Sequence, residues 1–161
     1  MAMVDPAGGR IKSPTLQLIL ALVLSSCAHG ESPLSDFSLS EKAETVNVVL
    51  KEWFVLPDKM AVDEGDVTFK VDNRGQMDHE FIIIKTTMSV HDLPVHEKGL
   101  NEKKAGKMIG EIEDLRPGEI REITVHMSPG SYVLFCNKVE IEDHKIISHY
   151  RRGMRVGFTV K

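Results

Sequence analysis

Cysteine is scarce in this sequence, which has only Cys27 and Cys136 among 161 residues. Two cysteines cannot build a disulfide framework, a four-cysteine zinc site or an iron–sulfur site. A surplus of positive charge is also missing, because the net charge is −4 and the pI is near 6.0. An acidic chain lacks the basic face with which nucleic-acid binders displace counterions, so we expect no nucleic-acid partner.

Long apolar runs are missing as well. The run at residues 16–24 is far shorter than a bilayer crossing, which needs about 20 apolar residues. Basic residues precede this run and small residues follow it, which is typical of a secretory signal. The sequence Leu24-Ser25-Ser26-Cys27 resembles the lipobox of bacterial lipoproteins, whose signal is cleaved before an acylated cysteine. This resemblance implies a signal peptide over residues 1–26 and a lipid on Cys27. The protein is then expected outside the cytoplasm, anchored to a bacterial membrane in the periplasm or at the cell surface.

The remaining chain divides into two parts by composition. Residues 27–44 are rich in serine and charge and have no sustained apolar period, which predicts a flexible tether. Residues 45–161 are long enough for one β-sandwich domain, and 42% hydrophobic residues can supply its core. We expect this domain to be a monomer.

Alternation of apolar and polar residues predicts strands near residues 45–51, 66–72, 79–85, 119–127, 131–136 and 154–160. Turn sequences such as Ser128-Pro129-Gly130 separate them. Residues 87–118 are polar and contain glycine, which predicts a long excursion with one short helix at most. The expected fold is therefore all-β, a Greek-key β-sandwich with a long polar excursion between strands.

Four residues with metal-binding side chains fall near the ends of these strands. His79 opens one strand, Cys136 ends another and Met154 opens the last, each on the same face as apolar residues. His149 lies five residues before Met154. Because a sandwich gathers its loops at its ends, these side chains can converge on one site. One thiolate, two imidazoles and one thioether are the ligand set of a type 1 copper centre, whereas zinc rarely takes a thioether.

Residues 46–161 resemble the cupredoxin family of blue copper electron carriers, most of all its rusticyanin, sulfocyanin and plastocyanin-like branches. The resemblance rests on Val67–Asn73, His79–Phe81, Leu115–Glu119, Pro129–Asn137, His149–Met154 and Phe158–Val160. It implies one type 1 copper ion, bound by His79, Cys136 and His149 as equatorial ligands and by Met154 as a weak axial ligand. The implied function is transfer of single electrons between respiratory partner proteins, which would dock over the edge of His149.

Two features depart from the family pattern. Twelve residues separate Cys136 from His149, where the family usually has a much shorter loop, and this insert contains a rival ligand, His144. We prefer His149, because it keeps a four-residue gap to the methionine, and residues 138–147 should then bulge away from the site. Glu80 stands where many members have Asn or Ser, so the hydrogen bonds that orient the ligands are expected to differ.

Other functions were weighed against electron transfer. An extracytoplasmic copper chaperone or copper-handling protein would use the same ligands without a redox partner. An enzyme such as a nitrite reductase or a multicopper oxidase fragment needs a second copper site, commonly built from additional histidines. The sequence has no His-x-His pair, so we do not expect an enzyme. A copper-free cupredoxin scaffold is disfavoured because all four ligand types are present.

Overall fold

The computed structural model describes residues 43–161. The predicted signal peptide, the lipobox cysteine Cys27 and nearly all of the predicted tether lie outside these residues. Within residues 43–161, no helix combines the length and the apolar character that a bilayer crossing requires.

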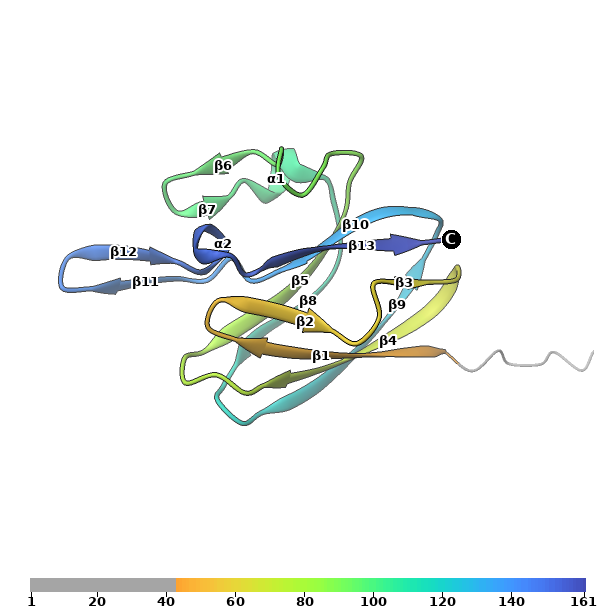
Figure 1. The fold of residues 1–161 in the computed structure, drawn as a ribbon, viewed down its shortest axis with the longest axis horizontal. Coiled ribbons are helices and arrows are strands. Elements are labelled where there is room, and N and C mark those ends of the chain that lie inside the picture. Colours follow the sequence, from red (N-terminus) through yellow and green to blue (C-terminus); the bar gives the residue numbers. More distant parts are fainter. Residues whose placement is uncertain (1–42) are drawn as a thin grey trace, which may run out of the picture. The chain divides into compact units, whose positions relative to one another are not determined.

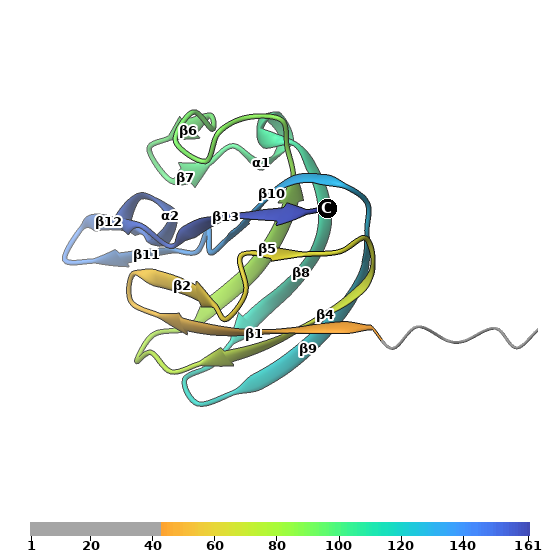
Figure 2. The same cartoon turned by 45° about the vertical axis from the view of Figure 1, so that its right-hand side comes forward.

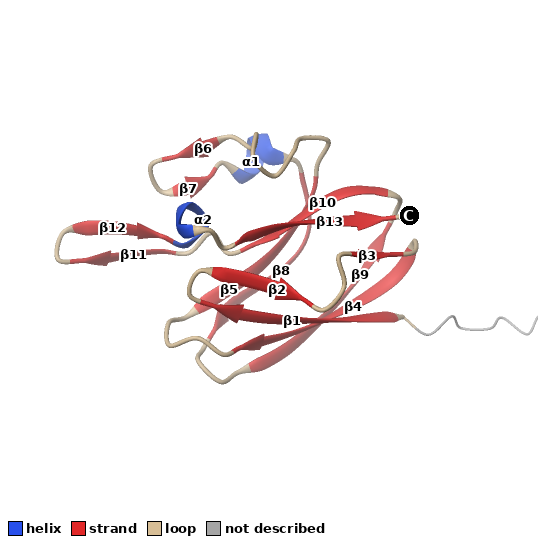
Figure 3. Ribbon diagram, in the orientation of Figure 1, coloured by secondary structure: helices blue, strands red, loops and turns tan. Residues whose placement is uncertain are grey.

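Two β-sheets build the domain (Figures 1 and 3). The four-stranded sheet has the order β2-β1-β4-β9, with β1 (Glu44–Lys51), β2 (Phe54–Pro57), β4 (Gly65–Asn73) and β9 (Ile120–Met127). The five-stranded sheet has the order β3-β13-β10-β5-β8, with β3 (Ala61–Val62), β5 (His79–Lys85), β8 (Lys107–Leu115), β10 (Gly130–Phe135) and β13 (Arg155–Val160). β1 runs parallel to β4 and β3 runs parallel to β13, while the other neighbours in these sheets are antiparallel. The all-β sandwich that the sequence predicts is confirmed.

The core lies between the two sheets, where the apolar faces predicted by alternation meet. Phe69 of β4 has its ring centroid 5.5 Å from Phe81 of β5 and 5.6 Å from Phe158 of β13. All three side chains are buried. Because β4 belongs to one sheet and β5 and β13 to the other, this aromatic cluster joins the two layers.

A second apolar cluster covers the outer face of the five-stranded sheet. Ile82 and Ile84 of β5 are buried there with Leu93, Leu100 and Ala105. These last three come from the segment that holds β6 (Val95–His96), β7 (Gly99–Leu100) and α1 (Glu102–Ala105). β5 is therefore apolar on both faces, as its sequence indicates, because each face is covered.

The prediction for residues 87–118 is wrong in its second half. Residues Lys107–Leu115 form β8, an edge strand that pairs antiparallel with β5. The ladder shifts register between His79 and Phe81 and between Ile83 and Ile84. A bulge breaks the period of two, so the buried Ile112 and Leu115 lie three residues apart and give no alternating pattern.

The insert between Cys136 and His149 forms an antiparallel hairpin of β11 (Val139–Glu142) and β12 (Lys145–Ser148). The one-turn helix α2 (His149–Arg152) follows it directly. Figures 1 and 2 show this hairpin reaching outward from the end of the sandwich where α2 and the β1–β2 turn lie. The expected bulge is thus a regular hairpin, and it projects beyond the sheets.

Candidate metal site

His79 is the first residue of β5, so strand pairing sets its position. It lies opposite Leu115 of β8 and is fully buried. The connection from β4 crosses above its ring at Gly75, where an added Cβ would come within 2.9 Å of His79 Nε2. Glycine permits this close approach, because any side chain would collide with the imidazole.

Asn73, the last residue of β4, holds this connection in place. Its Nδ2 donates to Met77 O at 2.9 Å and to Leu115 O at 2.8 Å, and its Oδ1 accepts from Gly75 N at 2.9 Å. Glu52 adds a second anchor, since its Oε1 accepts from Gln76 N at 2.7 Å and from Met77 N at 2.9 Å. The peptide above His79 is therefore fixed by two side chains from the four-stranded sheet and its β1–β2 turn.

Cys136 directly follows β10 and is fully buried. Its N–H donates to Met154 O at 3.0 Å, and its Sγ accepts from Glu80 N at 3.4 Å. The next residue, Asn137, donates its N–H to Glu80 Oε1 at 2.8 Å. Glu80 therefore ties the strand of His79 to the segment of Cys136.

The side chain of Asn137 hydrogen-bonds to the β7–α1 segment. Its Oδ1 accepts from Leu100 N at 2.7 Å, and its Nδ2 donates to Leu100 O at 3.1 Å and to Glu102 Oε1 at 2.7 Å. These bonds hold the β7–α1 segment against the residue next to Cys136. The side chain of Asn137 therefore braces this covering segment.

His149 is the first residue of α2, and local hydrogen bonds set its position. Its N–H donates to Lys138 O at 3.0 Å across the base of the hairpin, and its carbonyl accepts from Met154 N at 3.1 Å. Ser148 caps α2 by accepting from Arg151 N at 3.3 Å. The imidazole is fully buried.

Three of the four predicted ligands have their donor atoms close together. Cys136 Sγ lies 3.3 Å from His149 Nδ1 and 3.9 Å from His79 Nδ1, and the two Nδ1 atoms are 3.1 Å apart. This trio is the one group of its kind within residues 43–161 that could hold a metal ion. Met154 is buried in the same apolar cluster as Cys136, and its main chain bonds to both Cys136 and His149.

His144 lies apart from this cluster. It occupies the turn of the β11–β12 hairpin, where its φ is +63°, and its side chain is exposed. Of the two histidines in the insert, only His149 belongs to the group with His79 and Cys136.

The outer nitrogens of the two imidazoles face carboxylates. His79 Nε2 is 3.5 Å from Glu52 Oε1, and His149 Nε2 is 3.7 Å from Glu140 Oε1. Sequence analysis missed both glutamates, because Glu52 lies in the β1–β2 turn and Glu140 in the hairpin insert. No local motif links either of them to its histidine, so only the folded chain shows the contact.

Burial determines the protonation of the cluster. Burial, together with the neighbouring His79, lowers the pKa of His149 to about 4. Burial also lowers the pKa of His79, although Glu52 opposes this. Both imidazoles are thus neutral at pH 7, the form that binds metals. Burial raises the pKa of the Cys136 thiol to about 12, so formation of the thiolate requires a cation at the site.

Trp53 closes the site on the side of the β1–β2 turn. Its ring packs edge-on against His149, with centroids 5.3 Å apart and an interplanar angle of 83°. The guanidinium of Arg152 lies over the indole, 5.0 Å from its centroid. No local sequence pattern indicates this contact, since Trp53 and His149 are far apart along the chain.

The donor set fits copper better than zinc. A single thiolate and two neutral imidazoles beside a buried thioether match the ligands of a type 1 copper centre. Structural zinc sites close a tetrahedron with two or more cysteines or with histidines and carboxylates. Glu52 and Glu140 face the outer nitrogens of the imidazoles. Within residues 43–161 no carboxylate joins the group formed by Cys136 Sγ and the two Nδ1 atoms.

Comparison with solved structures finds auracyanins among the similar proteins. The chain is 25% identical to a dithionite-reduced auracyanin from the photosynthetic bacterium Roseiflexus castenholzii, with a TM-score of 0.53 over 74% of this chain and 99% of that chain. Auracyanin B is 18% identical, with a TM-score of 0.52 over 74% of this chain and 89% of that one. Auracyanin A, a "blue" copper protein from Chloroflexus aurantiacus, is also 18% identical, with a TM-score of 0.51 over 74% and 100% of the two chains.

Comparison with curated proteins found no match. Residues 15–147 match the family described as a cupredoxin-like domain. This match includes His79 and Cys136 and ends just before His149. It covers well over half of the 161 residues, and the two-sheet fold agrees with it. The chain therefore belongs to the cupredoxin-like family.

Proposed function

We propose that this protein binds one copper ion at His79, Cys136 and His149, with Met154 as a weaker fourth ligand, and that it carries single electrons. The observation that supports this most strongly is the convergence of Cys136 Sγ with the two Nδ1 atoms in a fully buried cluster. A bound copper ion supplies a one-electron centre there. The protein's own residues hold the ligands and exclude water.

The frame around the ligands suits electron transfer. His79 and Cys136 adjoin β5 and β10, two neighbouring strands in the middle of a sheet, and Glu80 ties the two segments together. A stiff frame keeps the ligands nearly still when the charge of the centre changes, which keeps the reorganisation cost low. Among the similar structures, one auracyanin is in a dithionite-reduced form and another is described as a "blue" copper protein.

The proposed location follows from the N-terminal sequence. Cleavage before Cys27 and acylation of that residue would tether the domain to a bacterial membrane, outside the cytoplasm. Redox partner proteins in the same compartment would then donate and accept the electrons. The sequence Leu24-Ser25-Ser26-Cys27 supports this proposal.

Copper loading tests the metal centre. Titration of the purified protein should reach one copper per chain and produce an intense thiolate-to-copper band in the visible spectrum. Cys136→Ser should abolish the band, whereas His126→Ala, at an exposed position on β9, should leave it unchanged. A Cys136→Ser variant that kept the colour would overturn the proposed site. Binding without reversible redox cycling would favour a copper-handling role.

Membrane fractionation tests the anchor. The wild-type chain expressed in bacteria should appear in the membrane fraction with lipid mass on residue 27, because acyl chains supply about 0.8 kcal/mol per buried CH₂. Cys27→Ser should shift the protein to the soluble fraction or leave it unprocessed. A wild-type protein that is wholly soluble and carries no lipid would refute the anchor.

A further inference from the structure

Electrons cannot reach the metal site through an exposed ligand, because neither imidazole in the cluster reaches the surface. His79 and His149 are both fully buried. Gly75 and its neighbours, fixed by Asn73 and Glu52, cover His79. A partner must therefore couple to the site through atoms that cover one of these rings.

Trp53 offers a packed aromatic path outward. Its indole contacts the His149 ring at a centroid distance of 5.3 Å, and its side chain is partly exposed. Electron tunnelling weakens steeply with distance and is more efficient through packed atoms than across gaps. A partly exposed aromatic ring in contact with a proposed ligand satisfies both conditions.

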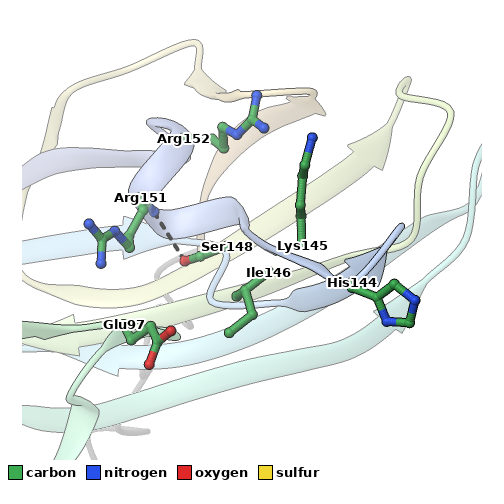
Figure 4. Close-up of a pocket in the computed structure, with 7 residues that line it drawn as sticks. All are labelled: Glu97, His144, Lys145, Ile146, Ser148, Arg151 and Arg152. Atoms are coloured by element: carbon green, nitrogen blue, oxygen red, sulfur yellow. Dashed lines mark hydrogen bonds between the residues drawn. The ribbon is translucent and has the colours of Figure 1, made fainter.

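A cationic side chain of α2 lies against this ring. Arg152 stacks over the indole at 5.0 Å, and its neighbour Arg151 is also exposed on α2. The two arginines and Lys145 line a cavity of about 560 Å³, in which Glu97 is the one carboxylate (Figure 4). In that view Lys145 and Arg152 extend toward the same side. This surface opposes the overall charge of the chain, which is −4.

Apolar contact area lies next to these cations. Ile141 and Ile146 are directly opposed on the β11–β12 hairpin and are 74% and 39% exposed. Ile146 also lines the same cavity. Glu140, Glu142 and Asp143 place acidic groups along the hairpin, so the cations are concentrated on the α2 side, at Arg151 and Arg152. Exposed apolar side chains next to charged groups are typical of a docking surface.

We propose that Trp53, Arg151 and Arg152 form the electron port of this protein and that the port docks a redox protein whose surface carries carboxylates around its own centre. This proposal rests on the proposed copper function. In each transfer, one electron passes between the site and the one-electron centre of the partner through the His149–Trp53 contact. No proton moves and no covalent bond forms or breaks. Trp53 serves as the medium and is not itself oxidised.

Two inorganic oxidants of opposite charge test the port without the natural partner. The copper-loaded, reduced protein is mixed in a stopped-flow instrument with hexacyanoferrate(III), an anion, or with tris(phenanthroline)cobalt(III), a cation. Arg151→Glu/Arg152→Glu should slow the reaction with the anion by about tenfold or more at low salt and accelerate the reaction with the cation. Both effects should shrink as salt is added.

Lys104→Glu/Lys107→Glu is the matched control. It makes the same change in net charge, but Lys107 pairs with Lys85 at the opposite end of β5 from His79. Its rates with both oxidants should stay within about threefold of wild type. Equal effects of the two double variants would overturn the port, because net charge alone would then explain the rates.

Trp53→Leu tests the path itself. With the visible band retained, its rates with both oxidants should fall severalfold, whereas Trp53→Phe should keep most of the rate. Unchanged or faster rates in Trp53→Leu would refute the path through the indole. The visible band separates the two proposals: without it in wild type the copper function fails, whereas an intact band with insensitive rates removes only the port.

Anionic phospholipid vesicles supply the remaining arm. Suppose that Arg151→Glu/Arg152→Glu loses affinity for phosphatidylserine vesicles while its oxidation rates match those of the control variant. The cationic side chains would then contact a membrane, and the proposed electron port would be wrong.

Discussion

His79 belongs to a central strand, whereas His149 belongs to a one-turn helix at the foot of a hairpin. The first is held by partners far away in sequence, since Asn73 joins β4 to Leu115, 42 residues further on. The second is held by near neighbours, namely Lys138, Ser148 and Met154. The same cluster is therefore built half from the sheets and half from local structure.

This difference separates global from local stability. Disturbing the His79 side breaks contacts between strands of both sheets, so the whole domain should lose stability. Disturbing the His149 side should loosen α2 and the hairpin and leave the sandwich nearly intact. The following variants compare the two sides, in order of decreasing effect.

Asn73→Ala should have the largest effect on stability. It removes three hydrogen bonds and leaves buried backbone groups without their partners, so the free energy of unfolding should fall by about 2–4 kcal/mol. Urea unfolding of the metal-free protein measures this loss. The control is Asn47→Ala, whose exposed bond to Asp58 should contribute less than about 1 kcal/mol. Equal losses of unfolding free energy in the two variants would mean that the contacts around His79 contribute no more to stability than an exposed hydrogen bond.

Glu80→Gln should change the pH dependence of stability. Burial raises the pKa of Glu80 to about 7, although the bond from Asn137 N–H opposes this. The folded state thus holds the proton more tightly than the unfolded chain. The stability that this proton supplies is complete below about pH 4.5 and is lost as the pH rises through about 7.

The glutamine keeps an oxygen for Asn137 N–H and carries no charge. At pH 8 the free energy of unfolding of the variant should therefore exceed that of wild type by about 1–2 kcal/mol, a value discounted for the partial exposure of Glu80. At pH 4 the two free energies should agree. The titrating histidines are common to both proteins and cancel in this difference. Glu122→Gln on the exposed face of β9 is the control and should change little at either pH. A difference that is independent of pH would contradict the prediction.

Ser148→Ala tests the local side. It removes the cap of α2, at a cost of about 0.5–1 kcal/mol. Hydrogen exchange should accelerate at α2 and the base of the hairpin while amides of β5 and β10 keep their protection. Ser131→Ala, at an exposed position on β10, should change neither. Faster exchange throughout the sheets would mean that the contacts around His149 stabilise the whole domain, as those around His79 do.

The strands that carry the site were predictable because their core faces alternate strictly. β5 showed apolar residues on both parities, which indicated cover on both sides, and the structure supplies it. β8 was missed because its bulges put Ile112 and Leu115 three residues apart. Alternation reports a strand only where its pairing is regular.

The contacts around the predicted ligands were far less predictable than the ligands themselves. His79, Cys136 and His149 stand out because their residue types and order carry chemistry. Glu52 and Trp53 are ordinary residues until the β1–β2 turn brings them beside the two imidazoles. Such contacts join parts of the chain that only the fold brings together, so no local pattern encodes them.

His144→Ala should have the smallest effect of all and tests which histidine of the insert belongs to the site. His144 is exposed in the hairpin turn, so its loss should change the free energy of unfolding by less than about 0.5 kcal/mol. The visible band of the copper-loaded variant should match wild type. His149→Ala should lose or alter the band, because it removes a donor atom 3.3 Å from Cys136 Sγ, and added imidazole should restore it in part. If His144→Ala destroyed the band while His149→Ala kept it, the local side of the cluster would be wrongly assigned, and the strand-borne half with His79 and Cys136 would remain.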